Sequence, residues 1–149
     1  MLEALPLLPR GHRLAVIGSG PMEPELRRRT VELGVADRVL WPGRLTPVEL
    51  YRWYRAADVV VSLSRRECFG LTVAEGLAAG AAVVASDIGP HRDVVTLAGV
   101  SASDLVPVRA TPQQVAAAVV AARRPPPGLT LPDLDDVTRA TEARYEEVV

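Results

Sequence analysis

The sequence contains no lysine, a single cysteine, few aromatic residues and no long apolar run. Seventeen arginines nearly balance eighteen acidic residues, so the net charge of −1 provides no positive field for nucleic acid, and we expect no nucleic-acid partner. A lone cysteine, Cys68, excludes an internal disulfide. Neither an apolar run of about 18 residues nor a secretory leader pattern occurs, which predicts a cytoplasmic chain.

The sequence is rich in aliphatic residues and proline. Hydrophobic residues make up 48% of the chain and aromatics only 4%, so the core must be built from Ala, Val and Leu. A chain of 149 residues is long enough for one domain with a substantial core. We predict such a domain in residues 1–124, a stiff proline-rich spacer in residues 125–132 and a C-terminal helix in residues 133–149.

Short β-branched apolar segments alternate with helical patterns along the chain. Two helix starts are marked by capping boxes, which begin at Thr46 and Thr111 and carry proline at the first helical position. The alternation predicts an α/β fold with a doubly wound, Rossmann-like parallel sheet. Its strands are expected at residues 14–17, 38–41, 58–63, 82–85 and 105–108, and its helices at residues 2–8, 21–33, 46–57, 71–79, 91–97 and 111–123.

The chemistry of the chain is expected between Ser62 and Gly80, where a buried strand leads into a helix. Glu67 and Glu75 flank the turn that starts this helix, and carboxylates at this place are suited to bind hydroxyl groups of a ligand. The first turn of a helix has free N–H groups and about half a positive charge, so it can hold a phosphate. The residues expected around that phosphate are Phe69, Gly70, Leu71 and Thr72.

Other loops should join this site, because ligands of doubly wound sheets bind beyond the carboxyl ends of the strands. These loops hold Gly18 and Gly20 after the first strand, Arg44 and Leu45 after the second, and residues 86–90 after the fourth. Gly18-x-Gly20 could also start a dinucleotide fingerprint, but Glu23 occupies the place of its third glycine.

The E-x7-E spacing of Glu67 and Glu75 resembles that of the retaining glycosyltransferases of the GT-B fold, the glycosyl transferases group 1 family. Further matching segments occur in the order of that family, and the resemblance covers roughly residues 3 to 95. These segments are Gly18-Ser19-Gly20-Pro21, Asp37-Arg38-Val39 with Gly43, Ala57-Asp58, Glu75-Gly76-Leu77-Ala78-Ala79-Gly80 and Val83-Val84-Ala85-Ser86.

The resemblance implies that this chain is the nucleotide-sugar-binding, C-terminal half of such an enzyme. Glu67 would be catalytic, holding the hydroxyls of the donor sugar, and Glu75 would bind the ribose. The backbone amides of residues 70–72 would hold the diphosphate without a metal or other cofactor, and the backbone near Arg44 and Leu45 would contact the base. The sugar would pass with retention to an acceptor hydroxyl on a saccharide, a lipid or a small molecule, in the cytoplasm or at the cytosolic face of a membrane.

The chain departs from the family in two ways. The family's half-domain begins one strand earlier, and the loop after that strand carries an Arg and a Lys for the diphosphate. Because the missing strand is central in the sheet, its two neighbours must close up or another chain must fill the gap, and self-association is one expectation. The N-terminal, acceptor-binding domain is also missing, so we expect no sugar transfer by this chain alone.

Several residues near the motif have an ordinary structural interpretation beside a functional one. Arg65 and Arg66 are either solvated or a phosphate contact, and Cys68 is expected to be inert rather than a nucleophile. His91 is expected to be a solvated loop residue, although the family's loop here borders the transferred sugar. Asp133-x-Asp135 matches the metal-binding motif of another glycosyltransferase fold, but two acidic residues in the first turn of a helix are explained by capping and by the helix dipole.

Two other functions stay open at this point. A noncatalytic nucleotide-binding or interaction module would have the same fold and would also bind nucleotide. A purely structural α/β domain would bind no ligand.

Overall fold

The structure is a computed structural model that describes residues 1–100 and 105–129. The expected C-terminal helix of residues 133–149, with its Asp133-x-Asp135 pair, lies outside the described residues, so that prediction and the domain boundaries stay untested. The strands are β1 (Leu14–Ile17), β2 (Val39–Gly43), β3 (Val59–Ser62), β4 (Ala82–Ser86) and β5 (Leu105–Val106). The helices are η1 (Leu2–Leu7), α1 (Glu23–Glu32), η2 (Ala36–Arg38), α2 (Pro47–Ala56), α3 (Leu71–Ala78), α4 (Gly89–Leu97) and α5 (Pro112–Ala121), of which η1 and η2 are 3-10 helices.

All five expected strands are present, with different ends. β2 continues through Pro42 and Gly43, which were expected in the following loop. β5 is shorter than expected and stops before Pro107, which has no N–H for a sheet ladder. The chain turns there, since the N–H of Ala110 donates to the carbonyl of Pro107 at 2.8 Å.

Both predicted capping boxes are confirmed. In α2 the Glu49 N–H donates to Thr46 Oγ1 at 3.3 Å, and the Thr46 N–H donates to Glu49 Oε2 at 2.8 Å. Thr111 and Gln114 make the same reciprocal pair at α5. Two backbone N–H groups at each helix start, which would otherwise lack a partner, are thereby hydrogen-bonded within four residues. Because these bonds are local in the sequence, the two helix starts could be predicted.

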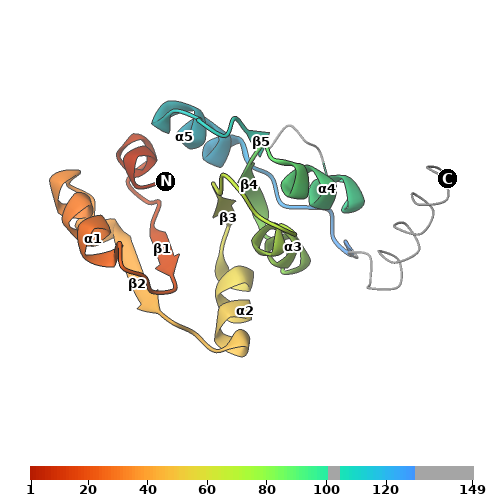
Figure 1. Ribbon diagram of the computed structural model, residues 1–149, viewed down its shortest axis with the longest axis horizontal. Helices are drawn as coiled ribbons and strands as arrows, with labels where there is room; N and C mark the ends of the chain where they lie inside the picture. Colours follow the sequence, from red (N-terminus) through yellow and green to blue (C-terminus); the bar gives the residue numbers. More distant parts are fainter. Residues whose placement is uncertain (101–104, 130–149) are drawn as a thin grey trace.

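The strands form two parallel sheets rather than one. β1 pairs with β2, and β3, β4 and β5 form a second sheet in that order. Figure 1 shows β1 and β2 on one side of the molecule and β3 to β5 on the other. The strands on either side of the expected gap, β1 and β3, have therefore not closed up into one ladder.

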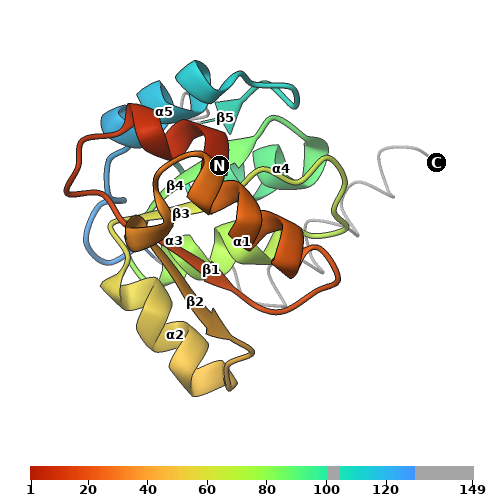
Figure 2. The same cartoon turned by 90° about the vertical axis from the view of Figure 1, so that its left-hand side faces the viewer.

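Helices cover both faces of the larger sheet, as expected for a doubly wound fold. One core cluster joins Val84 of β4 to η1 and α5, and the other joins Val83 and Ala85 to α3 and α4. Successive residues of β4 thus point into different cores, and all five are buried. Figure 1 and Figure 2 show η1 beside α5, and α3 between α2 and α4.

α3 lies very close to β3 because of a glycine. A Cβ built on Gly76 would be only 3.0 Å from Val60 Cβ and 3.1 Å from each of its methyl groups. Both residues are buried, so position 76 has no room for a side chain beside Val60. This contact packs α3 closely against β3.

We predict that Gly76→Val destabilises the chain by about 1–3 kcal/mol, because the added methyl groups overpack against Val60. The measurement is urea unfolding followed by circular dichroism. Ala78→Val is the matched control, since it places valine on the exposed face of the same helix and should cost less than about 1 kcal/mol. Equal stability of the two variants would contradict the packing argument.

Candidate functional site

Six of the ten residues expected at the site lie at or near the N-terminus of α3, namely Glu67, Phe69, Gly70, Leu71, Thr72 and Glu75. Gly70 precedes this helix with φ 67° and ψ 33°, in the left-handed region that favours glycine. There is no room for a side chain either, because a Cβ would be 3.1 Å from the Pro90 carbonyl oxygen and 3.3 Å from His91 Cδ2. Because Gly70 has no side chain, the start of α3 packs directly against α4.

The N-terminus of α3 has no side-chain cap among the described residues. The N–H of Val73 bonds back to the Gly70 carbonyl at 3.0 Å, which leaves the amides of Leu71 and Thr72 at the tip. Leu71 is 64% exposed, and Phe69 just before the helix is 74% exposed. An anion can therefore reach these amides, with an apolar surface beside it.

Glu67 lies on the α4 side of this helix end and is held by its neighbours. Ser62 Oγ donates to Glu67 Oε1 at 3.0 Å, and His91 Nε2 lies 3.2 Å from Glu67 Oε2. Hydrogen bonding from Ser64 first, and then from Ser62 and the positive charge of His91, lowers the pKa of Glu67 although partial burial opposes this shift. The carboxylate is 19% exposed, so it stays ionised and keeps lone pairs for a ligand.

His91 is the one site residue whose environment was predicted wrongly. It was expected to be solvated, but it is 0% exposed and lies at the start of α4. Its Nδ1 donates to the Ser86 carbonyl at 2.8 Å, and Ser86 Oγ lies 3.3 Å from the same atom. The carbonyl can only accept, so this bond orients the ring and turns Nε2 toward Glu67.

Glu75 lies on the opposite side of α3, facing α2. Tyr54 Oη donates to Glu75 Oε2 at 3.0 Å. Burial and the nearby Glu75 carboxylate raise the pKa of Tyr54 to about 12, so its hydroxyl keeps the proton that it donates. Glu75 itself is exposed, which leaves its other oxygen accessible to a ligand.

A second group of expected residues lies on the other sheet. Gly18 directly follows β1, and its N–H donates to the Gly43 carbonyl at 2.8 Å, which holds the loops after β1 and β2 side by side. Arg44 Nε also donates to Ser19 Oγ at 2.8 Å. Gly20 is exposed in the same loop.

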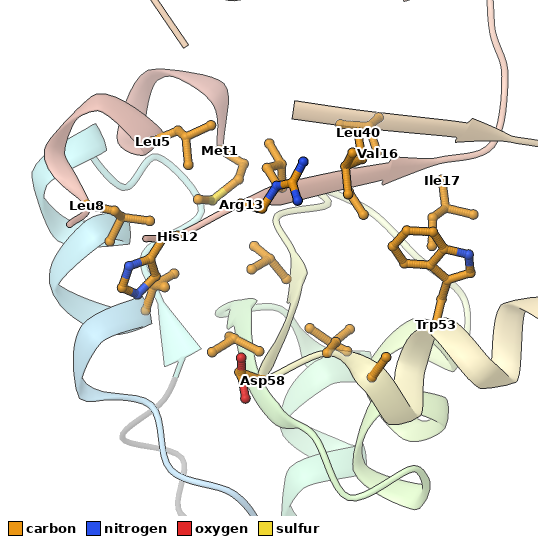
Figure 3. Close-up of a pocket in the computed structure, with 18 of the residues that line it drawn as sticks. Met1, Leu5, Leu8, His12, Arg13, Val16, Ile17, Leu40, Trp53 and Asp58 are labelled. Carbon is orange, nitrogen blue, oxygen red and sulfur yellow. The ribbon is translucent and has the colours of Figure 1, made fainter. Parts of the chain in front are cut away.

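A cavity of about 1880 Å³ lies between the two sheets (Figure 3). Its lining includes four expected site residues, which are Gly18, Arg44, Leu45 and Thr72. The other six expected residues do not line it; these are Gly20, Glu67, Phe69, Gly70, Leu71 and Glu75. Most of the cavity extends between the two sheets, so its greatest volume is not beside the carboxylates.

Two positioning residues were missed by the sequence analysis. Tyr54 reaches Glu75 from 21 residues away, and Ser62 is buried at the end of β3 beside Glu67. A polar residue at the end of a buried strand is a signal that could have identified Ser62. For Tyr54 no local pattern was available, because its partner lies on another helix.

Three other candidates near the motif are exposed, namely Arg65, Arg66 and Cys68. Cys68 is a free thiol. Within residues 1–100 and 105–129, no cluster of three or more His, Cys, Asp or Glu residues could bind a metal ion. In the same part of the chain, every helix is too short or too polar to span a membrane.

The comparisons with known proteins agree on one family. The family model described as "Glycosyl transferases group 1" matches residues 1–123. The lipopolysaccharide core biosynthesis mannosyltransferase LpsB of Rhizobium meliloti is 41% identical over 100 residues, which cover 64% of this chain and 28% of that protein. The chain thus spans less than a third of the length of this relative.

Solved structures of glycosyltransferases have a similar fold. Anabaena HepE in complex with UDP superposes with a TM-score of 0.67 at 23% identity, over 80% of this chain and 33% of that one. HepE has also been solved with UDP-glucose. The C-terminal domain of a glycosyl transferase group 1 family protein, LpcC of Francisella tularensis, superposes with a TM-score of 0.66 at 27% identity, over 80% of this chain and 65% of that domain.

We predict that Glu67→Gln costs about 1–3 kcal/mol of stability near pH 7, because Ser62 and His91 lose a charged partner. The pKa of Glu67 is lowered in the folded chain, so its stabilising effect is fully present above the ordinary value of about 4.3 and is lost as the pH falls through the folded value. The difference between wild type and variant should therefore shrink below about pH 4.

Urea unfolding at a series of pH values measures this difference. Glu25→Gln is the control for loss of a carboxylate, because Glu25 is an exposed carboxylate of α1. A Glu67→Gln effect that stays constant from pH 7 to about pH 3 would contradict the electrostatic account.

Proposed function

The chain belongs to the glycosyl transferases group 1 family, and on this premise we propose that it binds the nucleotide-diphosphate sugar of a retaining glycosyltransferase. Its fold is the Rossmann-like half of a GT-B enzyme. The observation that carries the proposal is the uncapped N-terminus of α3, with Glu67 held on one side and Glu75 on the other. The nucleotide ligands of HepE support the choice of donor.

In this proposal the diphosphate binds the amides at the tip of α3. Glycine at position 70 lets α4 pack against the start of α3, and the helix dipole adds about half a positive charge at this helix end. As the glycosidic bond breaks, negative charge collects on the leaving diphosphate. Fixed amides stabilise that charge more in the transition state than in the ground state, so no metal or other cofactor is needed.

Glu67 is proposed to hold hydroxyls of the donor sugar and to stabilise positive charge on its ring. Its ionised state and its fixed orientation suit both tasks, because Ser62 and His91 restrain it before the ligand arrives. His91 does not reach the surface, so it acts through Glu67 as a positioning residue. Glu75, restrained by Tyr54, is proposed to bind the ribose hydroxyls.

The base is proposed to lie over the loops after β1 and β2, near Gly18, Gly20, Arg44 and Leu45. These residues belong to the other sheet, so the donor would bridge both sheets. The acceptor is a saccharide, a lipid or a small molecule, and it would bind a domain outside the described residues. We also propose a cytoplasmic enzyme, at the cytosolic face of a membrane where the acceptor is a lipid.

We predict that the isolated chain binds one nucleoside diphosphate but transfers no sugar. Calorimetric titration with UDP, GDP and ADP, and with their sugar conjugates, should give saturable binding for one base. Glu75→Ala should weaken that binding about tenfold or more, through loss of charged hydrogen bonds to the ribose. EDTA should leave the affinity unchanged, since the helix end replaces the metal.

Glu32→Ala is the matched control, because Glu32 is an exposed carboxylate on α1 that forms ion pairs with Arg28 and Arg29 of the same helix. Binding that needs a divalent cation would contradict the proposed role of α3. Equal affinity of wild type and Glu75→Ala would contradict the role of Glu75, and no binding of any diphosphate would contradict the proposal itself.

The second candidate is a noncatalytic nucleotide-binding module, which is favoured by the division of the site between two unpaired sheets. Both functions predict nucleotide binding, and Glu67 separates them. In a longer polypeptide that contains this domain and an acceptor domain, Glu67→Ala should abolish sugar transfer if the chain is catalytic. An unchanged transfer rate would support the noncatalytic module.

A further inference from the structure

The hydrogen bond between Tyr54 and Glu75 joins two helices of the proposed donor site. Tyr54 lies on α2, which follows the loop of Arg44 and Leu45, and Glu75 lies on α3. Tyr54 Oη donates to Glu75 Oε2 at 3.0 Å. Tyr54 also lines the same cavity as Arg44, Leu45 and Thr72. The bond thus links the helix that follows the proposed base loop to the helix that starts at the proposed diphosphate site.

Glu75 is an acidic group without a basic partner in the described part of the chain. None of the ion pairs between residues described by the structure includes it. Its side chain is exposed, and Tyr54 uses only one of the roughly four lone-pair positions of the carboxylate. A phosphate is itself an acceptor and carries negative charge, so it cannot bind there. The remaining positions suit neutral hydroxyl donors.

Tyr54 fixes the orientation of this carboxylate. The terminal torsion of a glutamate side chain is broad, so an exposed carboxylate without a partner takes many orientations. Tyr54 is half-buried, and its pKa of about 12 keeps the hydroxyl a donor, although a hydrogen bond from the Thr72 side chain lowers that pKa in part. Tyr54 is therefore held from the first turn of α3 while it holds Glu75 in the next turn.

A carboxylate with a fixed orientation matches two hydroxyls on neighbouring carbons. Ribose carries its 2′- and 3′-hydroxyls on neighbouring carbons, and each of them can donate to the carboxylate. A 2′-deoxyribose offers only one donor and leaves part of a charged acceptor unpaired, which weakens binding. The penalty is largest when the carboxylate cannot turn to improve the one bond that remains.

We propose that Tyr54 is a positioning residue that makes the site selective for ribonucleotides, by holding Glu75 so that it accepts hydrogen bonds from both the 2′- and the 3′-hydroxyl. The inference rests on the proposed function, in which Glu75 binds the ribose. It adds the class of ligand that the site rejects, the 2′-deoxyribonucleoside diphosphates. Tyr54 acts through Glu75 and needs no contact with the ligand.

The test is calorimetric titration of the 149-residue chain with UDP, GDP and ADP and with their 2′-deoxy counterparts. For the base that binds most tightly, the wild type should bind the 2′-deoxy form about tenfold more weakly or worse. Tyr54→Phe should reduce this ratio by about fivefold, because it weakens the ribonucleotide more than the 2′-deoxy form.

Tyr51→Phe is the matched control, since it also removes a hydroxyl from α2 and Tyr51 is 47% exposed. It should leave the ratio unchanged. Glu75→Ala should bring the ratio close to one with Tyr54 still present, so the test does not depend on the folding of Tyr54→Phe alone. Added to Glu75→Ala, Tyr54→Phe should have no further effect on either affinity, because Tyr54 acts only through Glu75.

Three results would overturn the inference and leave the proposed nucleotide binding intact. They are equal affinity of the wild type for both forms, equal weakening of both forms by Tyr54→Phe, and an unchanged ratio in Glu75→Ala. The second of these would show that Tyr54 has only a structural role. Failure to bind any of these nucleotides would contradict the proposed function itself, and the inference with it.

Discussion

The close packing of Gly70 at the start of α3 against α4 is the constraint on which the candidate site depends. Only a glycine adopts its left-handed backbone at low cost, and only a residue without Cβ fits against the Pro90 carbonyl and His91. This packing brings the start of α3 against His91, the residue that orients Glu67. The uncapped end of α3 and Glu67 are thereby positioned by one contact.

The polar groups beside Gly70 form a short chain of hydrogen bonds. The Ser86 carbonyl orients His91, His91 faces Glu67, and Ser62 holds the other oxygen of that carboxylate. All the described buried side-chain polar atoms have partners, which keeps the cost of burying His91 low. The ligand would then meet a carboxylate that is already ionised and oriented.

The division of the strands into two sheets separates the site into two halves. Glu67, Glu75 and the tip of α3 belong to the larger sheet, whereas the loops at Gly18 and Arg44 belong to the smaller one. Their relative position depends on packing between the two sheets and not on a continuous ladder of hydrogen bonds. A ligand that contacts both halves would therefore stabilise the whole domain by linkage.

The sequence by itself determined the features that arise within a few residues. The capping boxes at Thr46 and Thr111, the five strands and the approximate start of α3 follow from local hydrogen bonds and apolar periodicity, and the structure agrees. Only the tertiary structure decided the burial of His91, the partner of Tyr54 and the cavity between the two sheets. Each of these depends on side chains or strand edges that are far apart in the sequence, and no local pattern specifies which of them meet in space.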